Sequence, residues 1–124
     1  MRIYLRLVII YVKAYICNMR DLTLFYAALS DPTRLRLLSL MKHKEICVCY
    51  LQEVLQTNQP KISRHLAYLK RAGLVEARRD GKWSHYRLKK LNADLDKILS
   101  QTLISLSSES QITKDARRLK QVGC

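Results

Sequence analysis

The 124-residue sequence has few glycines, no long uninterrupted apolar run and few acidic residues. Three glycines leave no glycine-rich loop that could cradle a phosphate, and no nucleophile is paired with a base and an orienting group. We therefore do not expect an enzyme. The apolar stretch from Ile3 to Ile16 is broken by Arg6 and Lys13 and is shorter than the about 20 residues of a membrane helix. It also lacks the cleavage pattern of a signal peptide.

The shortage of acidic residues leaves a strong positive charge. Lys and Arg number 23 against 10 Asp and Glu, which gives a net charge of +13. Such an excess on a small domain favours an anionic partner, either nucleic acid or a membrane surface. The cysteines form no regular framework, so we expect reduced thiols in a cytoplasmic protein. They are Cys17, Cys47, Cys49 and Cys124.

The length fits one domain with extensions at both ends. Residues 1–18 are an apolar extension of uncertain status: they pack on the domain as a strand or helix, or translation begins only at Met19. Residues 19–106 are the expected folded domain, and residues 107–124 a polar, basic tail that is weakly helical at best. A basic membrane-associated protein anchored by residues 3–16 is a more distant alternative, and we do not expect a membrane partner.

Apolar residues at spacings of three and four predict five helices within residues 19–106. We expect these helices to begin near Arg20, Pro32, Val48, Gln59 and Leu91. Asp31 and Asn58 precede prolines and are suited to cap the second and fourth helices, and Gly73 should end the fourth.

A β-hairpin is expected between the fourth and fifth helices. Residues 74–79 and 82–88 flank Asp80-Gly81, the strongest short signal for a two-residue turn. Trp83 and Tyr86 on the second strand could stack on single-stranded nucleic acid, but we expect them to pack in the core. His85 is interpreted as an ordinary strand residue.

Two helices joined by a tight turn and followed by a basic hairpin are typical of a winged helix-turn-helix. The predicted fold is thus mainly α with a β-hairpin wing, and the fourth helix is the expected recognition helix. We predict that polar and basic residues of this helix and of the wing contact DNA, by base edges or by phosphates. They are Gln59, Lys61, Ser63, Arg64, His65, Tyr68, Arg78, Arg79 and Lys82. The alternative is an ordinary solvated helix face.

Four strings carry a family resemblance: LSDPTRLRLL, ICVCYL, QPKISRHLAYLKRAGLV and DGKWSHYRL. They resemble the ArsR family of metalloregulatory winged-helix repressors, and specifically its arsenic-responsive members, over about residues 21–90. The resemblance implies a homodimer formed by the first and last helices. It also implies that the dimer binds an inverted-repeat operator in the promoter of a resistance operon and leaves it when an inducer binds. A two-fold dimer would place its recognition helices in successive major grooves.

Cys47 and Cys49 are the candidate inducer site. Residues i and i+2 diverge in a helix but point the same way in an extended segment, where two sulfurs could hold one soft ion at about 2.3 Å. We therefore expect the pair to chelate only when the start of its helix deforms, which would displace the DNA-reading face. Two alternatives stay open: both thiols are small buried hydrophobes, or they form a redox switch through a strained disulfide.

Thiolates select soft metals and metalloids, and trivalent arsenic or antimony accepts two or three sulfurs. The arsenic-responsive pattern often has a third cysteine three residues after the second, where this chain has Gln52. Cys17 could replace it, which resembles the family's cadmium and lead sensors with a cysteine-bearing N-terminal arm. Cys124 is expected to be inert. The family's zinc and nickel sites use histidines on the last helix, and this chain has none there.

Overall fold

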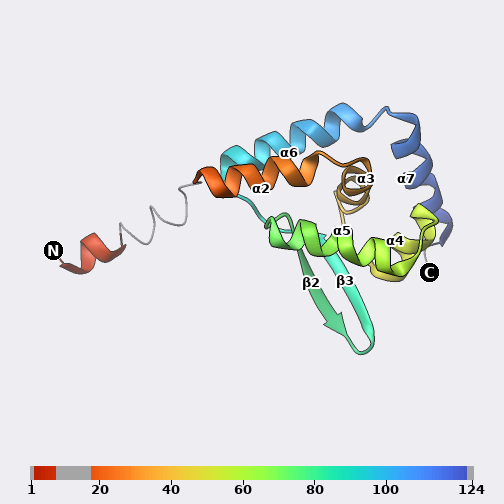
Figure 1. Cartoon of the computed structure of the whole chain (residues 1–124), viewed down its shortest axis with the longest axis horizontal. Coiled ribbons are helices and arrows are strands. Elements are labelled where there is room, and N and C mark those ends of the chain that lie inside the picture. Colours follow the sequence, from red (N-terminus) through yellow and green to blue (C-terminus); the bar gives the residue numbers. More distant parts are fainter. Residues whose placement is uncertain (1, 8–17, 123–124) are drawn as a thin grey trace.

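The computed structural model describes residues 2–7 and 18–122. Its helices are α2 (Met19–Leu29), α3 (Pro32–Leu40), α4 (Val48–Leu55), α5 (Gln59–Arg71), α6 (Ala93–Leu106) and α7 (Ser110–Val122). Its strands are β1 (Ile46–Cys47), β2 (Val75–Asp80) and β3 (Trp83–Leu88). The β2–β3 hairpin projects away from the helices (Figure 1). The predicted class, mainly α with a β-hairpin wing, is confirmed.

Local hydrogen bonds explain where the helices begin. Before each of four helices, an Asn or Asp side-chain oxygen accepts the backbone N–H three residues later, which satisfies an otherwise unpaired donor of the first turn. These caps are Asn18, Asp31, Asn58 and Asn92, with N···O distances of 2.9–3.0 Å. The predicted caps Asp31 and Asn58 are confirmed. Gly73 follows α5 with a φ of +79°, a conformation that favours glycine.

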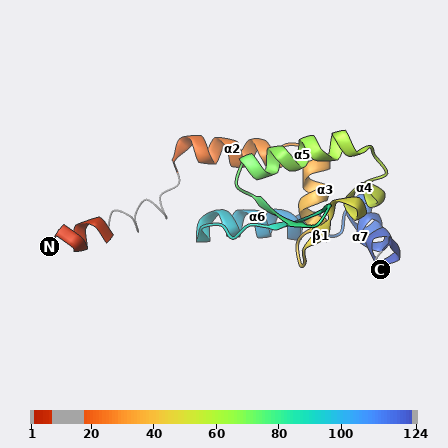
Figure 2. The same ribbon diagram turned by 90° about the horizontal axis from the view of Figure 1, so that it is seen from below.

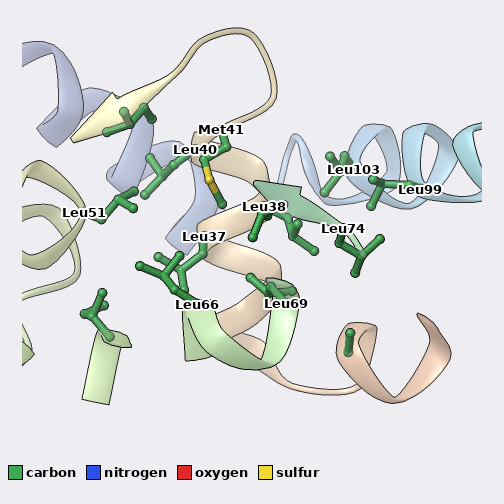
Figure 3. Packing of buried hydrophobic residues seen from close by; sticks show 14 of the residues in the cluster. Leu37, Leu38, Leu40, Met41, Leu51, Leu66, Leu69, Leu74, Leu99 and Leu103 are labelled. Atoms are coloured by element: carbon green, nitrogen blue, oxygen red, sulfur yellow. The ribbon is translucent and has the colours of Figure 1, made fainter. Parts of the chain in front are cut away.

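The core surrounds α3, which packs against α2, α5, α6 and α7. Leu37 and Leu38 of α3 are fully buried, and leucines of α4, α5 and α6 point toward them (Figure 3). The core-facing side of α5 consists of Ile62, Leu66 and Leu69, each with no exposed surface. Because this side packs against the core, the residues on the opposite side of α5 are exposed to solvent.

The sheet has the strand order β1–β3–β2 and is antiparallel throughout. Asp80 pairs with Trp83, so Gly81 and Lys82 form the two-residue loop, one residue later than predicted. Gly81 takes a φ of +61° there. Strand β1 was not predicted from the sequence, because two residues are too few to show an alternating pattern. It joins the segment before α4 to the wing, with Cys47 opposite His85.

The core placement predicted for Trp83 is wrong. Trp83 lies at the tip of the hairpin and is 47% exposed, whereas Tyr86 packs against the core as expected. Alternate residues of a strand point to opposite faces, so residues 83 and 86 lie on different sides of the sheet. Lys82 places its ammonium group 5.3 Å from the centre of the Trp83 ring.

The expectation that the C-terminal tail is weakly helical at best is also wrong. Helix α7 packs against α3 and α4 (Figure 2). Its Asp115 is 1% exposed and accepts hydrogen bonds from Arg36 Nε at 2.7 Å and Nη2 at 2.8 Å. Gln111 Nε2 donates to the same carboxylate at 2.9 Å. The hydrogen bonds to Asp115 raise the pKa of Arg36.

We predict that Arg36→Ala lowers the free energy of unfolding by about 2–3 kcal/mol, because it leaves the carboxylate of Asp115 buried without its counter-ion. A fully buried pair would lose about 3–5 kcal/mol, but the Arg36 side chain is 22% exposed. Urea denaturation followed by circular dichroism measures the change. Asp115→Asn with Arg36→Ala should recover part of the loss, and an unchanged midpoint in Arg36→Ala would contradict the role of the ion pair.

Residues 2–7 are helical, and their apolar side chains are exposed, for example Ile3 at 76% and Tyr4 at 78%. The expectation that the N-terminal extension packs on the domain is therefore wrong for these six residues, while residues 8–17 lie outside the described part of the chain. Among the described helices, none combines the length and the apolar character needed to cross a bilayer.

Candidate functional site

Helices α4 and α5 form the helix-turn-helix, joined through Gln56, whose left-handed backbone (φ 52°) ends α4. On α5, four of the predicted DNA-contacting residues lie on the exposed side, opposite the buried apolar residues. They are Gln59, Lys61, Ser63 and Arg64. Packing of the apolar side against the core holds α5 in one orientation. The helix can therefore present its polar and basic side to a groove of DNA.

The other two predicted residues of α5 are half-buried. His65 Nδ1 lies 3.8 Å from Asp31 Oδ1, and burial lowers the pKa of His65, so this imidazole is neutral near pH 7. The ring of Tyr68 packs against the core, with the guanidinium of Arg34 4.1 Å from its centre. The structure thus places His65 and Tyr68 at the border of the exposed surface of α5 rather than within it.

The predicted wing residues Arg78, Arg79 and Lys82 are all exposed. Arg79 and Lys82 flank the hairpin tip, and Arg79 Nε donates to the Gly81 carbonyl at 3.4 Å. Arg78 lies further from the tip and donates from Nε to Glu45 Oε1 at 2.9 Å. One of the three predicted wing contacts is therefore held by a carboxylate that immediately precedes β1.

Trp83 is the chain's single tryptophan and lies in this basic tip, so its fluorescence should report DNA binding. We predict that titration with operator DNA quenches or shifts the emission by tens of per cent, since an exposed indole beside Lys82 would meet the DNA surface or the ordered water next to it. Emission that stays constant while anisotropy reports binding would place the wing tip away from DNA. The Trp83→Phe variant, which has no tryptophan, is the control for emission that does not come from Trp83.

Cys47 and Cys49 lie together at the start of α4. Cys47 ends β1 and is the N-cap residue of α4 with extended backbone (φ −66°, ψ 140°), whereas Cys49 lies in the first helical turn. Their sulfur atoms are 3.1 Å apart, well beyond the about 2.05 Å of a disulfide. Our expectation that the thiols meet only after the helix deforms is wrong, because Cys47 precedes the helix and the pair is already assembled.

The spacing fits a soft ion. Two sulfurs that bind one ion at about 2.3 Å, at angles between a right angle and the tetrahedral angle, lie about 3.3–3.8 Å apart. The observed separation is within a few tenths of an ångström of this range. Among residues 2–7 and 18–122, no group of three His, Cys, Asp or Glu side chains is arranged to hold a metal. Cys17, the predicted additional ligand, lies outside the described residues.

A surface pocket of about 290 Å³ adjoins Cys47. Glu45, which precedes β1, His85 of β3 and Leu119 of α7 also line it. His85 Nδ1 is 3.8 Å from Glu45 Oε1, and the hydrogen bond from Arg78 lowers the pKa of Glu45. Sequence analysis missed this cluster, because the pairing of β1 with β3 that assembles it leaves no local pattern in the sequence.

The helix-turn-helix with its exposed polar helix and basic wing defines the chain as a winged helix-turn-helix protein of the DNA-binding class. The sequence family described as "Bacterial regulatory protein, arsR family" matches residues 31–77. The chain belongs to this family of transcriptional regulators, which are not enzymes, as its similarity to the relatives below also shows.

Relatives and solved structures agree with this assignment. The chain is 38% identical over 101 residues to the arsenic resistance transcriptional regulator ArsR1 of Pseudomonas putida, covering 79% of this chain and 77% of that protein. It is 50% identical over 64 residues to the arsenical resistance operon repressor of Escherichia coli, covering 51% and 55%. The homodimeric winged helix-turn-helix domain of Mb0332 from Mycobacterium bovis matches with a TM-score of 0.63 and 27% identity, covering 72% and 81%.

Proposed function

We propose that the protein is a cytoplasmic, dimeric repressor of a metal(loid)-resistance operon, and that it leaves its operator when trivalent arsenic or antimony binds Cys47 and Cys49. The observation that carries the proposal is the pair of sulfurs 3.1 Å apart at the start of α4, the first helix of the helix-turn-helix. Relatives named for arsenic resistance support the choice of ion. Thiolate ligands favour such soft ions over magnesium or calcium.

The position of Cys47 explains how an ion could act on DNA binding. Cys47 pairs through β1 with His85 of the wing, and it also caps α4, the helix that leads into α5. An ion that sets its own S–ion–S angle favours a particular arrangement of these two elements. It shifts the population toward release only if this arrangement differs from the one that fits DNA.

A dimer is supported by apolar surface on α2 and α6. Tyr26 of α2 is 52% exposed and Ile104 of α6 is 53% exposed. A two-fold dimer in which these helices pack against the partner subunit would cover both side chains. It would also present two copies of α5 about one helical turn of DNA apart, which predicts an inverted-repeat operator.

Fluorescence anisotropy with labelled operator DNA tests the proposal. Reduced protein bound to the inverted repeat upstream of its own operon would be titrated separately with arsenite, antimonite, cadmium, lead and zinc. Release by arsenite and antimonite at low concentration is expected. Release only by cadmium or lead would favour Cys17 as a working ligand. Release by peroxide without metal would favour a redox switch, and no release by any of them would refute an inducible repressor.

Glu45 offers a test of the route from sulfur to wing. Glu45→Gln removes a charge beside Arg78, so we predict operator binding about two- to tenfold tighter without inducer, in line with the modest energy of an exposed ion pair. We also predict a smaller ratio between affinities without and with arsenite. Anisotropy with and without arsenite measures both. Glu76→Gln, which disrupts the exposed pair with Arg87, is the matched control and should change the ratio little.

A further inference from the structure

Arg34 of α3 contacts both α2 and α5. Its Nε donates to the Ala28 carbonyl at 2.9 Å and its Nη2 to the Ala27 carbonyl at 2.8 Å, in the last turn of α2. Its Cζ lies 4.1 Å from the centre of the Tyr68 ring on α5. We propose that Arg34 and Tyr68 are positioning residues that hold α5 in place relative to α2, and so set the operator spacing that the dimer accepts. This inference rests on the proposed function, in which α2 lies in the dimer interface.

The guanidinium of Arg34 makes both contacts with one rigid group. A guanidinium donates hydrogen bonds along its edge while its flat face can stack on an aromatic ring. The carbonyls of the last helical turn have no partner within the helix, and a cation there also interacts favourably with the helix dipole. The backbone of Arg34 is held as well, since its N–H donates to Asp31 Oδ1 at 3.0 Å. A shift of α5 relative to α2 would therefore break the stack, the hydrogen bonds or both.

The contacts of Tyr68 fix the other end of this link. Its ring packs against the core, beside the fully buried Leu69. Both α2 and α5 pack against α3, the helix that carries Arg34. One turn before Tyr68, His65 Nδ1 lies 3.8 Å from Asp31 Oδ1 at the start of α3. Helix α5 thus meets the start of α3 at two positions one turn apart, which defines its direction as well as its distance.

This link bears on DNA because a two-fold dimer reads two half-sites at once. The half-sites of such a dimer lie about one helical turn, or 34–36 Å, apart. One extra base pair between them adds about 3.4 Å and turns one half-site by about a tenth of a turn. A dimer with rigidly held α5 helices should reject this change, whereas a dimer with loosely held helices can adapt to it.

Operators with two spacings test the inference on the full-length protein. Anisotropy would compare the inverted repeat upstream of its own operon with the same repeat carrying one extra base pair between its half-sites. The readout is the ratio of the two affinities, because a protein that is merely destabilised loses affinity for both operators equally. Tyr68→Leu and Arg34→Leu should each lower this ratio by about two- to thirtyfold, the range that loss of one cation–π contact allows.

Two matched variants leave the link in place. Tyr68→Phe removes the hydroxyl but keeps an aromatic ring beside Arg34. Arg71 also lies near this ring, with its Cζ 5.8 Å from the centre, but it belongs to α5 itself and joins nothing to α2. Arg71→Leu therefore removes the same charge as Arg34→Leu without breaking the link. Both variants should keep the wild-type ratio within about twofold.

The outcomes separate the inference from the proposed function. Equal loss of affinity for both operators in Tyr68→Leu would overturn the inference alone, and so would a wild-type dimer that binds both spacings equally. A ratio lowered as much by Tyr68→Phe or Arg71→Leu would show that the stack on Arg34 is not its cause. Tyr68→Leu decides the matter if Arg34→Leu does not fold. A wild-type protein that does not bind the inverted repeat as a dimer would refute the proposed function, and the inference with it.

Discussion

Replacing Cys47 and Cys49 together by serine should abolish release of the operator by arsenite, while binding of the operator without arsenite stays within about threefold of the wild type. Serine cannot replace a thiolate for a soft ion, so the inducer loses its ligands. The DNA-contacting side chains predicted on α5 and the wing are untouched. Anisotropy titrations with and without arsenite measure both quantities on the same preparation.

Stability must be controlled in this experiment, because Cys47 is 7% exposed and a serine hydroxyl there would be buried. An unsatisfied buried hydroxyl costs about 1–3 kcal/mol. Cys49 is less buried, so Cys49→Ser alone should lose the response with less effect on the free energy of unfolding. Cys47→Ala provides an apolar replacement. A double variant that folds, binds DNA and still responds to arsenite would place the sensor elsewhere.

The parts of the fold that were predicted correctly have local causes. Asp31 and Asn58 cap helices through hydrogen bonds within three residues, and the apolar side of α5 repeats every three to four residues. Both features can be read from a short window of sequence. The exposed positions of Lys61 and Arg64 follow directly from that period, which is why the candidate DNA surface on α5 was largely anticipated.

The parts that were missed depend on contacts between distant segments. Strand β1 exists because Ile46 and Cys47 pair with β3, about 40 residues later along the chain. That pairing leaves Cys47 extended and brings its sulfur beside Cys49 instead of on the opposite side of a helix. In α7, Asp115 breaks the apolar pattern because its partner is Arg36 of α3. In the sequence, each residue of such a buried ion pair looks like an ordinary exposed charged residue.

These contacts also change the expected route of the response. From the sequence, we expected deformation at the start of α4 to displace the DNA-reading face. The structure connects the thiols to the wing as well, through β1 and through the hydrogen bond of Glu45 with Arg78. The two parts of the candidate DNA surface thus meet at one segment of about three residues. On the proposed function, an ion bound there would act on both parts at once.

Operator binding should weaken by about 10³- to 10⁵-fold between 50 and 200 mM salt, the range for proteins that make about six to ten phosphate contacts. The proposed dimer would offer up to ten, from five basic residues of each protomer. These are Lys61, Arg64, Arg78, Arg79 and Lys82. Each phosphate contact releases condensed counter-ions, so a plot of log affinity against log salt should be linear with a slope no steeper than about −9.

The wing's share of this slope can be isolated by Arg79→Ala with Lys82→Ala. Both side chains are exposed at the hairpin tip and are not paired with Glu45, so their loss should remove up to four contacts per dimer and make the slope shallower by up to about 3.6. Lys114→Ala with Arg117→Ala removes the same charge from exposed positions of α7. If both double variants lower the slope equally, the protein's net charge rather than a docked wing accounts for the salt dependence. A slope that changes only in the wing variant places the hairpin tip on the phosphates.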